Sequence, residues 1–234
     1  MTETLARRAN QSISSNPNLL DVMGSGADGG SSQFPVFNSV PLYLRETLVF
    51  PYTEGARFQN ALYGKMGQAA FAEVFRRPPE TTQHILHPQK YFDHSAPTSP
   101  AFPKVAPGKG FRDLSEGMLG ELDHAILIRQ YGTREQADSI ASHWRGGRYW
   151  LLEDKSKSRV ILRYVSEWDS PAIAQEFFRF YAQVLRKKWK TMEVTGENEG
   201  MLSGTGDDGY FVVRRTGSQV SSVEGLASPE QAVR

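Results

Sequence analysis

The sequence of 234 residues contains no cysteine, which excludes disulfides, thiolate nucleophiles, iron–sulfur clusters and every zinc site built on cysteine. It also lacks an excess of charge of one sign, because 27 lysines and arginines stand against 26 aspartates and glutamates. Nucleic-acid-binding domains usually carry a clear basic excess, so we expect no nucleic-acid partner. No apolar run approaches the roughly 20 residues that a membrane-spanning helix needs.

The sequence also lacks the short motifs of several enzyme classes. It has no G-x-S-x-G nucleophile elbow, no G-x-x-x-x-G-K-[ST] phosphate loop and no H-E-x-x-H zinc-binding helix. We therefore assign no catalytic residue and expect no cofactor. The first residues include arginines but no apolar core of a secretory signal, so a cytoplasmic location is the default expectation.

Composition divides the chain into three parts. Residues 1–34 form a helical lead-in that ends in a connector rich in glycine and serine, Gly24 to Ser32, which cannot pack a core. Residues 35–145 carry apolar positions at helical spacing, and residues 146–234 carry segments of aromatic and branched side chains typical of strands. We expect residues 35–234 to form one compact domain.

The helical part begins with dense apolar residues. Between Pro35 and Arg77 their spacing predicts a pair of helices, interrupted around Gly64 to Gly67 and ended by Pro78 and Pro79. Leu44 and Leu48 lie before the break at Pro51, and Phe75 belongs to the apolar positions that recur after it at three- and four-residue steps. The prolines between Ser95 and Gly110 then predict an extended surface loop.

The remaining pattern predicts the fold class. Apolar residues predict a helix from Leu114 to Tyr131, and Thr133 with Gln136 matches a capping box that starts another. Ser170-Pro171 predicts the start of a helix with a serine cap. Strands are expected at Tyr149–Glu153, Arg159–Trp168, Gly209–Arg215 and Val220–Glu224, with a possible short one at Lys190–Val194. The class is therefore α+β, with a small, mostly antiparallel sheet in the order β-β-α-β-β and one helix packed on it.

Two pairs of residues are weak candidates for a metal site. His84 and His87 lie close together, with His94 nearby, and imidazoles are common zinc ligands. Glu121 and His124 have the E-x-x-H spacing by which one helix of a di-iron bundle provides two ligands. Pro88 ends any helix that His84 and His87 share, and the sequence has no second E-x-x-H pair. We therefore predict no metal site.

A glycine pair flanked by arginines is a further candidate. Gly146 and Gly147 lie between Arg145 and Arg148, and such a turn can bind an anion through its backbone N–H groups. A tight entry into a strand is the commoner role of this pattern, and we leave both interpretations open.

A spaced set of motif residues extends over about residues 42–190. Its members are Phe50, Pro51, Tyr52, Gly55, His87, Pro88, Tyr91, Gly120, Glu121, Gly147, Arg148 and Tyr149. With them, the chain resembles a family of bacterial proteins related to the gluzincin zinc metallopeptidases. The resemblance implies that the zinc site lies upstream, in an H-E-x-x-H helix and a following glutamate-bearing helix. No residue of this chain matches one of those ligands.

The resemblance implies a non-catalytic C-terminal portion of a metallopeptidase-like protein. Such a portion would form part of a peptide cleft or pair with a separate zinc-bearing half, and relatives in that family are often exported. Two alternatives stay open. One is a self-standing binding or structural module that uses an exposed sheet edge. The other is an enzyme of another kind that uses His84, His87, Glu121 or His124. The oligomeric state is not predicted.

Overall fold

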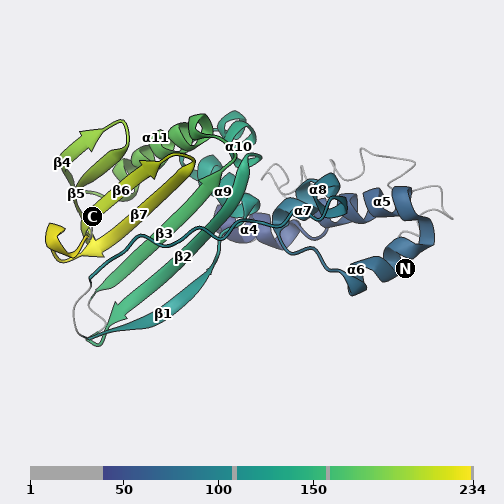
Figure 1. The fold of residues 1–234 in the computed structure, drawn as a ribbon, viewed down its shortest axis with the longest axis horizontal. Coiled ribbons are helices and arrows are strands. Elements are labelled where there is room, and N and C mark those ends of the chain that lie inside the picture. Colours follow the sequence, from purple (N-terminus) through teal and green to yellow (C-terminus); the bar gives the residue numbers. More distant parts are fainter. Residues whose placement is uncertain (1–38, 107–109, 157–158, 233–234) are drawn as a thin grey trace. The chain divides into compact units, whose positions relative to one another are not determined.

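The computed structural model describes residues 39–106, 110–156 and 159–232, and these fall into two compact units that divide between Ala96 and Pro97 (Figure 1). The expected connector, Gly24 to Ser32, lies outside the described residues. The chain divides near Ala96, whereas we expected one compact domain over residues 35–234 with a change from helices to sheet near residue 145. The division lies earlier because residues 97–106 and 110–118 already belong with the sheet.

The first unit is helical. As the sequence predicts, a helix pair is interrupted at Gly67, whose φ of 59° favours glycine, and the pair ends just before Pro78. A small core of Phe58, Leu62, Ala70 and Tyr91 holds these helices together. The elements are α4 (Leu42–Val49), α5 (Glu54–Met66), the 3₁₀ turn η1 (Gly67–Ala69), α6 (Ala70–Arg76), α7 (Thr82–Leu86) and α8 (Pro88–Phe92).

The second unit is a seven-stranded antiparallel sheet with three helices, which confirms the α+β class. The strand order across the sheet is β1-β2-β3-β7-β6-β5-β4. In chain order the elements are β1 (Phe111–Met118), α9 (Glu121–Tyr131), α10 (Arg134–Ala141), β2 (Trp144–Asp154), β3 (Val160–Trp168), α11 (Pro171–Lys188), β4 (Met192–Asn198), β5 (Met201–Gly206), β6 (Gly209–Thr216), β7 (Gln219–Leu226) and the 3₁₀ turn η2 (Pro229–Gln231).

Two segments differ from the prediction. Residues 114–118 belong to strand β1, not to a helix, because they pair with β2 in a ladder that runs from Phe111 opposite Asp154 to Met118 opposite Arg148. The helix begins only at Glu121, where the Asp123 carboxylate accepts a hydrogen bond from the Gly120 N–H. Strand β5 was not predicted, since its sequence, MLSGTG, is poor in residues that favour strands. The predicted caps at Thr133 and Ser170 are both present.

The two faces of the sheet are covered differently (Figure 1). Helices α9, α10 and α11 cover one face, and α11 contributes the buried aromatic side chains of Phe177, Phe178, Phe180 and Tyr181 to the larger core. On the other face, here called the open face, a smaller core forms around Leu152, Ile161 and Val223. The extended segment 97–106 crosses this open face, and Val105 packs against its core. Polar side chains toward the β1 edge of this face, such as Asp113 and Glu116, stay exposed.

Candidate functional site

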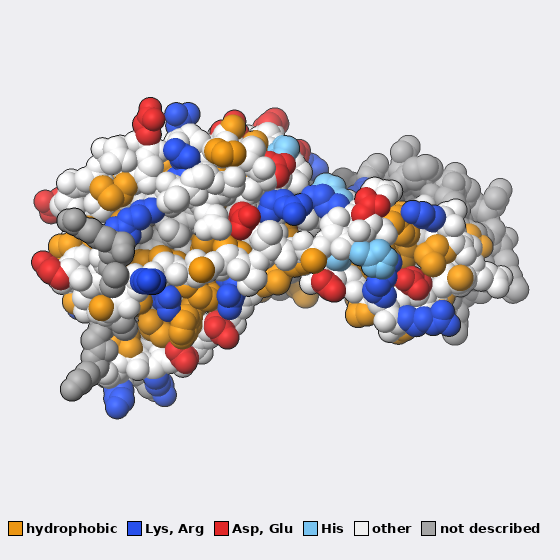
Figure 2. Space-filling model, viewed as in Figure 1, with side chains coloured by type: hydrophobic (Ala, Val, Ile, Leu, Met, Phe, Trp, Pro, Cys, Tyr) orange, Lys and Arg blue, Asp and Glu red, His pale blue; other side chains and the backbone are white. Residues whose placement is uncertain are grey.

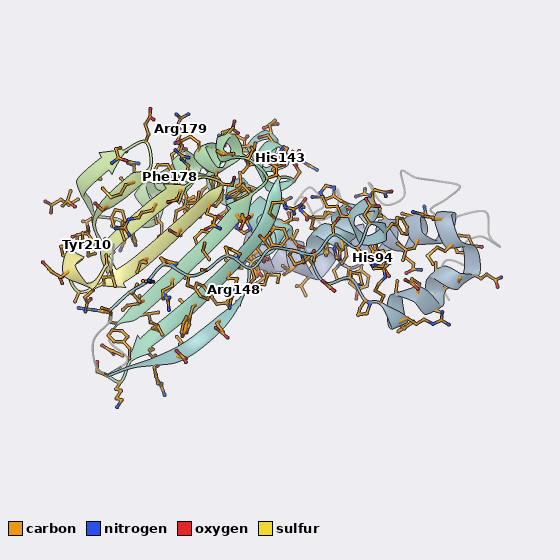
Figure 3. All side chains as sticks on the ribbon, in the orientation of Figure 1. His94, His143, Arg148, Phe178, Arg179 and Tyr210 are labelled. Carbon is orange, nitrogen blue, oxygen red and sulfur yellow. The ribbon has the colours of Figure 1, made fainter. Side chains whose placement is uncertain are left out.

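The histidines of the first unit have structural partners. His84 is buried, its Nε2 lies 2.8 Å from the Ser95 carbonyl, and its Nδ1 accepts a hydrogen bond from the Glu80 N–H. His87 precedes Pro88 as the N-cap residue of α8. His94 has a left-handed backbone, with φ of 55°, and its Nδ1 lies 3.2 Å from the Arg77 guanidinium (Figure 3). Both ring nitrogens of His84 are thus used inside the protein.

His124 lies in the core of the second unit. Its Nδ1 is 2.7 Å from the Gly120 carbonyl and its Nε2 is 2.7 Å from the Tyr164 hydroxyl. The neutral ring with a proton on Nδ1 satisfies both contacts, since the tyrosine hydroxyl can then donate to Nε2. The rings of Trp168 and Phe177 pack edge-on against it. Burial lowers the pKa of His124, which keeps the ring neutral.

Glu121 is also buried, in the first turn of α9. Within residues 39–106, 110–156 and 159–232, no group of three or more histidine, aspartate or glutamate side chains is placed to hold a metal ion. The structure therefore offers no donor set around either predicted pair.

Most of the motif residues shape the fold. Tyr91 is fully buried, and its hydroxyl donates to the Arg77 carbonyl at 2.6 Å. A Cβ atom on Gly147 would lie 2.7 Å from the Leu119 carbonyl oxygen and 3.0 Å from the His124 ring, so only glycine fits there. The glycine pair is part of strand β2, as the commoner interpretation of that pattern predicts.

The other motif residues are spread over helix ends and strand surfaces. Phe50 is buried after α4 and Gly55 lies in the first turn of α5, whereas Pro51 and Tyr52 between them are exposed. Tyr149 lies on β2, where its ring contacts Gly117 and its hydroxyl lies 3.2 Å from the Ser115 hydroxyl. Arg148, also on β2, lies on the open face. The motif residues therefore do not converge on one reactive centre within either unit.

The first unit has an apolar surface that the sequence did not predict. Of the eleven exposed large hydrophobic side chains in the described parts of the chain, seven lie between Tyr43 and Phe75. They include two pairs with helical i, i+4 spacing, Leu44 with Leu48 on α4 and Phe71 with Phe75 on α6. Figure 2 shows hydrophobic side chains at the surface of this unit on the face in view.

The degree of exposure is high for these residue types. Phe75 is 87% exposed, Tyr52 69% and Leu48 60%. Helix α4 has no buried residue at all. We call the set Tyr43, Leu44, Leu48, Tyr52, Met66, Phe71 and Phe75 the apolar helix surface. Leu44, Leu48 and Phe75 lie outside the small core of this unit, which other residues fill.

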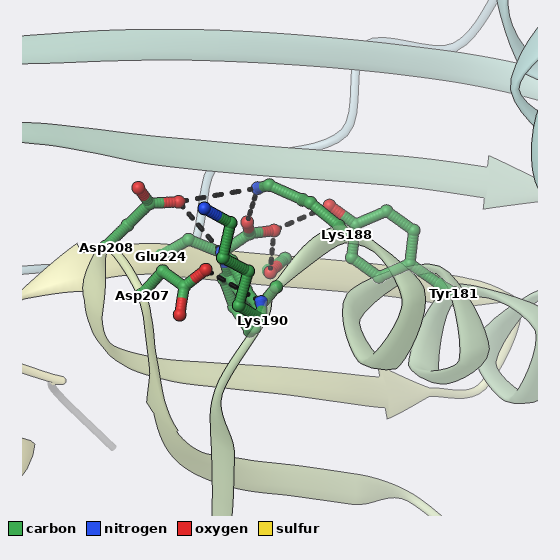
Figure 4. Close-up of polar contacts among 8 residues, drawn as sticks. Tyr181, Lys188, Lys190, Asp207, Asp208 and Glu224 are labelled. Atoms are coloured by element: carbon green, nitrogen blue, oxygen red, sulfur yellow. Dashed lines mark hydrogen bonds and ion pairs between the residues drawn. The ribbon is translucent and has the colours of Figure 1, made fainter.

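The second unit contains a buried carboxylate under α11 (Figure 4). Glu224 on β7 is 2% exposed, and its Oε1 accepts hydrogen bonds from the Tyr181 hydroxyl at 2.6 Å and the Ser222 hydroxyl at 2.9 Å. Its Oε2 accepts from the Lys188 ammonium group at 2.7 Å. Burial, together with the negative charge of Glu224, raises the pKa of Tyr181. Every oxygen of the carboxylate is thus satisfied, as expected of a structural anchor.

A histidine–carboxylate pair lies at the surface of the same unit. His143 Nδ1 is 2.5 Å from Asp169 Oδ2, and both side chains are half-exposed (Figure 3). Such a pair activates a nucleophile when a hydroxyl or thiol hydrogen-bonds to the other ring nitrogen. Among the residues with described positions, no hydroxyl does so. Sequence reasoning missed this pair because its members lie 26 residues apart, on either side of the β2–β3 hairpin.

Comparison with known proteins gives one family. A family model described as a domain of unknown function, DUF8575, matches residues 56–234, which include the whole of the second unit. Neither the curated proteins nor the solved structures contain a match to the chain. Among the described residues, no helix combines the length and apolar composition that crossing a bilayer requires. On the extent of its match, the chain belongs to the DUF8575 family.

Proposed function

We propose that this protein is the non-catalytic portion of a metallopeptidase-like protein and that it pairs with a zinc-bearing half through the apolar helix surface. The observation that carries the proposal is the exposure of Leu48, Tyr52 and Phe75, with their neighbours, on a unit that has only a small core. Leu44 with Leu48 and Phe71 with Phe75 form two exposed apolar pairs, and exposed apolar side chains that occur together mark interaction sites more often than singly exposed ones do.

The energetics support a docked partner. Burying apolar surface stabilises a complex by roughly 25 cal/mol per Å², and aromatic side chains contribute large areas. Phe75 and Tyr52 are therefore the strongest candidates for anchors, since buried aromatic residues often dominate the binding energy of an interface. The resemblance of about residues 42–190 to the gluzincin-related family directs the proposal to a zinc-bearing half, on a separate chain or in a longer protein.

The alternative of strand addition at a sheet edge is less well supported. The two edge strands, β1 and β4, each contain an irregularity in the ladder, near Leu114 and near Thr195. Bulges and charged side chains on edge strands are devices that oppose pairing with another chain. Strand β4 carries Glu193 and Glu197 in addition. Both edges thus have features that disfavour a further strand.

The test is a binding measurement with a defined partner. The reading frames beside the gene are searched for H-E-x-x-H, and pairing with a separate chain is refuted if none contains it; the product of a frame that does is purified and titrated with this protein in a calorimeter. We expect a one-to-one complex, and we expect the double variant Leu48→Gln/Phe75→Gln to weaken it at least tenfold. Leu114→Gln is the matched control, because Leu114 is also an exposed leucine but lies on β1. Equal binding by the double variant would refute the role of the apolar helix surface.

A further inference from the structure

Two arginines on the open face of the sheet contact the same aromatic ring. The guanidinium carbon of Arg148 lies 4.6 Å from the Phe102 ring centroid, and that of Arg163 lies 5.2 Å from it. Arg163 also lies 4.6 Å from the Trp150 ring centroid, and the two rings are 5.7 Å apart. Aromatic neighbours hold a guanidinium plane in place without using its hydrogen-bond donors.

Neither guanidinium is neutralised by a carboxylate within the described parts of the chain. The Nε–H of Arg163 donates to the Pro103 carbonyl at 3.0 Å, and one terminal nitrogen of Arg148 donates weakly to the Ser99 hydroxyl at 3.4 Å. The remaining terminal N–H groups have no protein acceptor among the described residues. The pKa of Arg163 is lowered by partial burial, but an arginine stays charged at neutral pH. Two oriented donor groups are therefore available on the open face.

The positions across the strands from Arg148 carry short side chains, of which Val165 is buried and Ser221 is half-buried. Arg148 lies opposite Val165, Val165 opposite Ser221, and Ser221 opposite Arg214. Cross-strand partners point to the same face of a sheet, so two short side chains separate Arg148 from a third arginine. Arg148 is labelled in Figure 3, where it lies beside the extended segment that crosses the sheet.

Acidic residues on the same face limit the charge that a ligand can carry. Glu116 lies opposite Trp150, Asp113 accepts a hydrogen bond from the Trp150 indole N–H, and Glu167 accepts one from Gln219. These carboxylates repel a dianionic phosphate or a nucleic-acid backbone more strongly than a single carboxylate. The guanidiniums already occupy positions over the Phe102 and Trp150 rings, which hinders stacking of nucleobases on them.

We propose that the open face beside Phe102 binds a peptide through a carboxylate held by Arg148 and Arg163. Guanidinium groups bind carboxylates in a planar, two-pronged geometry that an ammonium group cannot reproduce. The carboxylate comes from the peptide C-terminus or from an acidic side chain, and the half-buried Trp150, whose ring Arg163 contacts, provides an apolar contact. This site lies in the second unit and does not depend on the apolar helix surface.

The experiment titrates the whole protein with three acetylated Ala-Ala-Leu-Phe peptides at low salt. One has a free C-terminal carboxylate, one has a C-terminal amide, and one is amidated but carries glutamate in place of leucine. We expect the amidated neutral peptide not to bind and at least one carboxylate peptide to bind. Which of the two binds identifies the source of the carboxylate. Inorganic phosphate and an oligothymidylate serve as competing probes.

Variants connect the binding to the arginines. Arg148→Gln is expected to weaken binding tenfold or more, the usual effect of losing a hydrogen bond to a charged group. Arg148→Lys, which keeps the charge but not the planar donor pair, is expected to weaken it as well. Arg145→Gln is the matched control, since Arg145 is exposed on the same strand. Circular dichroism checks that each variant is folded.

Several results would overturn the proposal. They are equal binding of the neutral amidated peptide, no binding of either carboxylate peptide, tighter binding of the oligothymidylate, or full binding by the folded Arg148→Gln variant. If the Arg148→Gln variant does not fold, the Arg148→Lys variant is used to test the proposal. Unchanged peptide binding by Arg148→Lys would contradict recognition of the carboxylate by a planar guanidinium group. None of these outcomes depends on the zinc-bearing half, so failure here is distinguishable from failure of the proposed pairing.

Discussion

The Lys188 ammonium group lies 2.7 Å from the Glu224 carboxylate, which joins the last turn of α11 to the middle of the sheet (Figure 4). The Glu224 side chain is 3% exposed and that of Lys188 is 37% exposed. A buried carboxylate needs its hydrogen-bond donors, because an unpaired buried charge is costly. The contact therefore fixes the position of α11 on the sheet.

Loss of the cation is expected to destabilise the second unit. Lys188→Met leaves Glu224 with only the Tyr181 and Ser222 hydroxyls as side-chain donors. Because Lys188 is partly exposed, we expect a loss of about 1–2 kcal/mol, below the full cost of breaking a buried pair. Urea denaturation measures it. Arg179→Met is the control, since it removes a positive charge from an exposed position of the same helix (Figure 3). Equal losses in both variants would rule out a specific role for the contact.

We expect the free energy of unfolding to fall at acid pH because of His124. Burial lowers the pKa of this histidine in the folded state, whereas the unfolded chain takes up its proton near the ordinary value of 6.5. Stability is therefore complete above about pH 6.5 and falls as the pH drops below it, by at most about 1.4 kcal/mol per pH unit for one proton. Urea midpoints at pH 7.5 and pH 5 measure the loss. We expect a smaller pH dependence in His124→Asn, and an unchanged one would contradict this assignment.

We expect the hydrogen bond between the Tyr164 hydroxyl and His124 to stabilise the fold. Tyr164→Phe removes the group that lies 2.7 Å from the buried His124 Nε2. The nitrogen is then left without that partner, which costs about 1–3 kcal/mol. Tyr210→Phe is a suitable control, because Tyr210 lies on β6 and is only half-buried. Thermal or urea denaturation measures both, and a loss below about 0.5 kcal/mol in Tyr164→Phe would contradict the hydrogen bond.

Two glycines should respond oppositely to alanine. Gly147→Ala places a methyl group 2.7 Å from the Leu119 carbonyl oxygen, so the backbone must shift. We expect a loss of about 1–3 kcal/mol, as for other overpacked sites. Gly64 lies in α5 with nothing within 4 Å of the added atom, so Gly64→Ala is expected to add about 0.5–1 kcal/mol by improved helix propensity. Both are read from urea denaturation, and a neutral Gly147→Ala would refute the packing argument.

The first unit should tolerate changes on its surface but not in its core. Leu62 is fully buried, and Leu62→Ala is expected to cost about 2–5 kcal/mol. Phe75→Gln changes an 87% exposed side chain and is expected to alter stability by no more than about 0.5 kcal/mol. Thermal unfolding compares the two. A large loss in Phe75→Gln would mean that the apolar helix surface supports the fold and is not free for a partner.

Periodicity predicted most elements of the fold. The caps at Thr133 and Ser170, the β2–β3 hairpin and the helix that follows it were all predicted from residue types whose local preferences agree with the final structure. Residues 114–118 were mistaken for helix because Leu114 and Met118 are one helical turn apart, although the pairing with β2 decides their state. Long-range pairing of this kind has no signature within a short window.

The candidate sites could be predicted only in part. His84, His87, Glu121 and His124 were recognised as residues with possible chemistry, yet their partners, such as Tyr164 for His124, lie far away in the sequence. The exposure of Leu48 and Phe75 could not be read from spacing, since an apolar helical stripe looks the same against a core and against a partner. The cluster of Phe102 with Arg163 requires the path of segment 97–106 over the sheet.

The measurement that tests the account most directly is zinc content and peptide hydrolysis, measured for the purified protein alone and for its complex with the zinc-bearing half. The account predicts no stoichiometric zinc and no hydrolysis for the protein alone. It predicts bound zinc and peptide hydrolysis for the complex. Both should be reduced when the double variant Leu48→Gln/Phe75→Gln weakens the pairing. One tightly held zinc ion per molecule of the isolated protein, together with hydrolysis of peptides, would contradict the account.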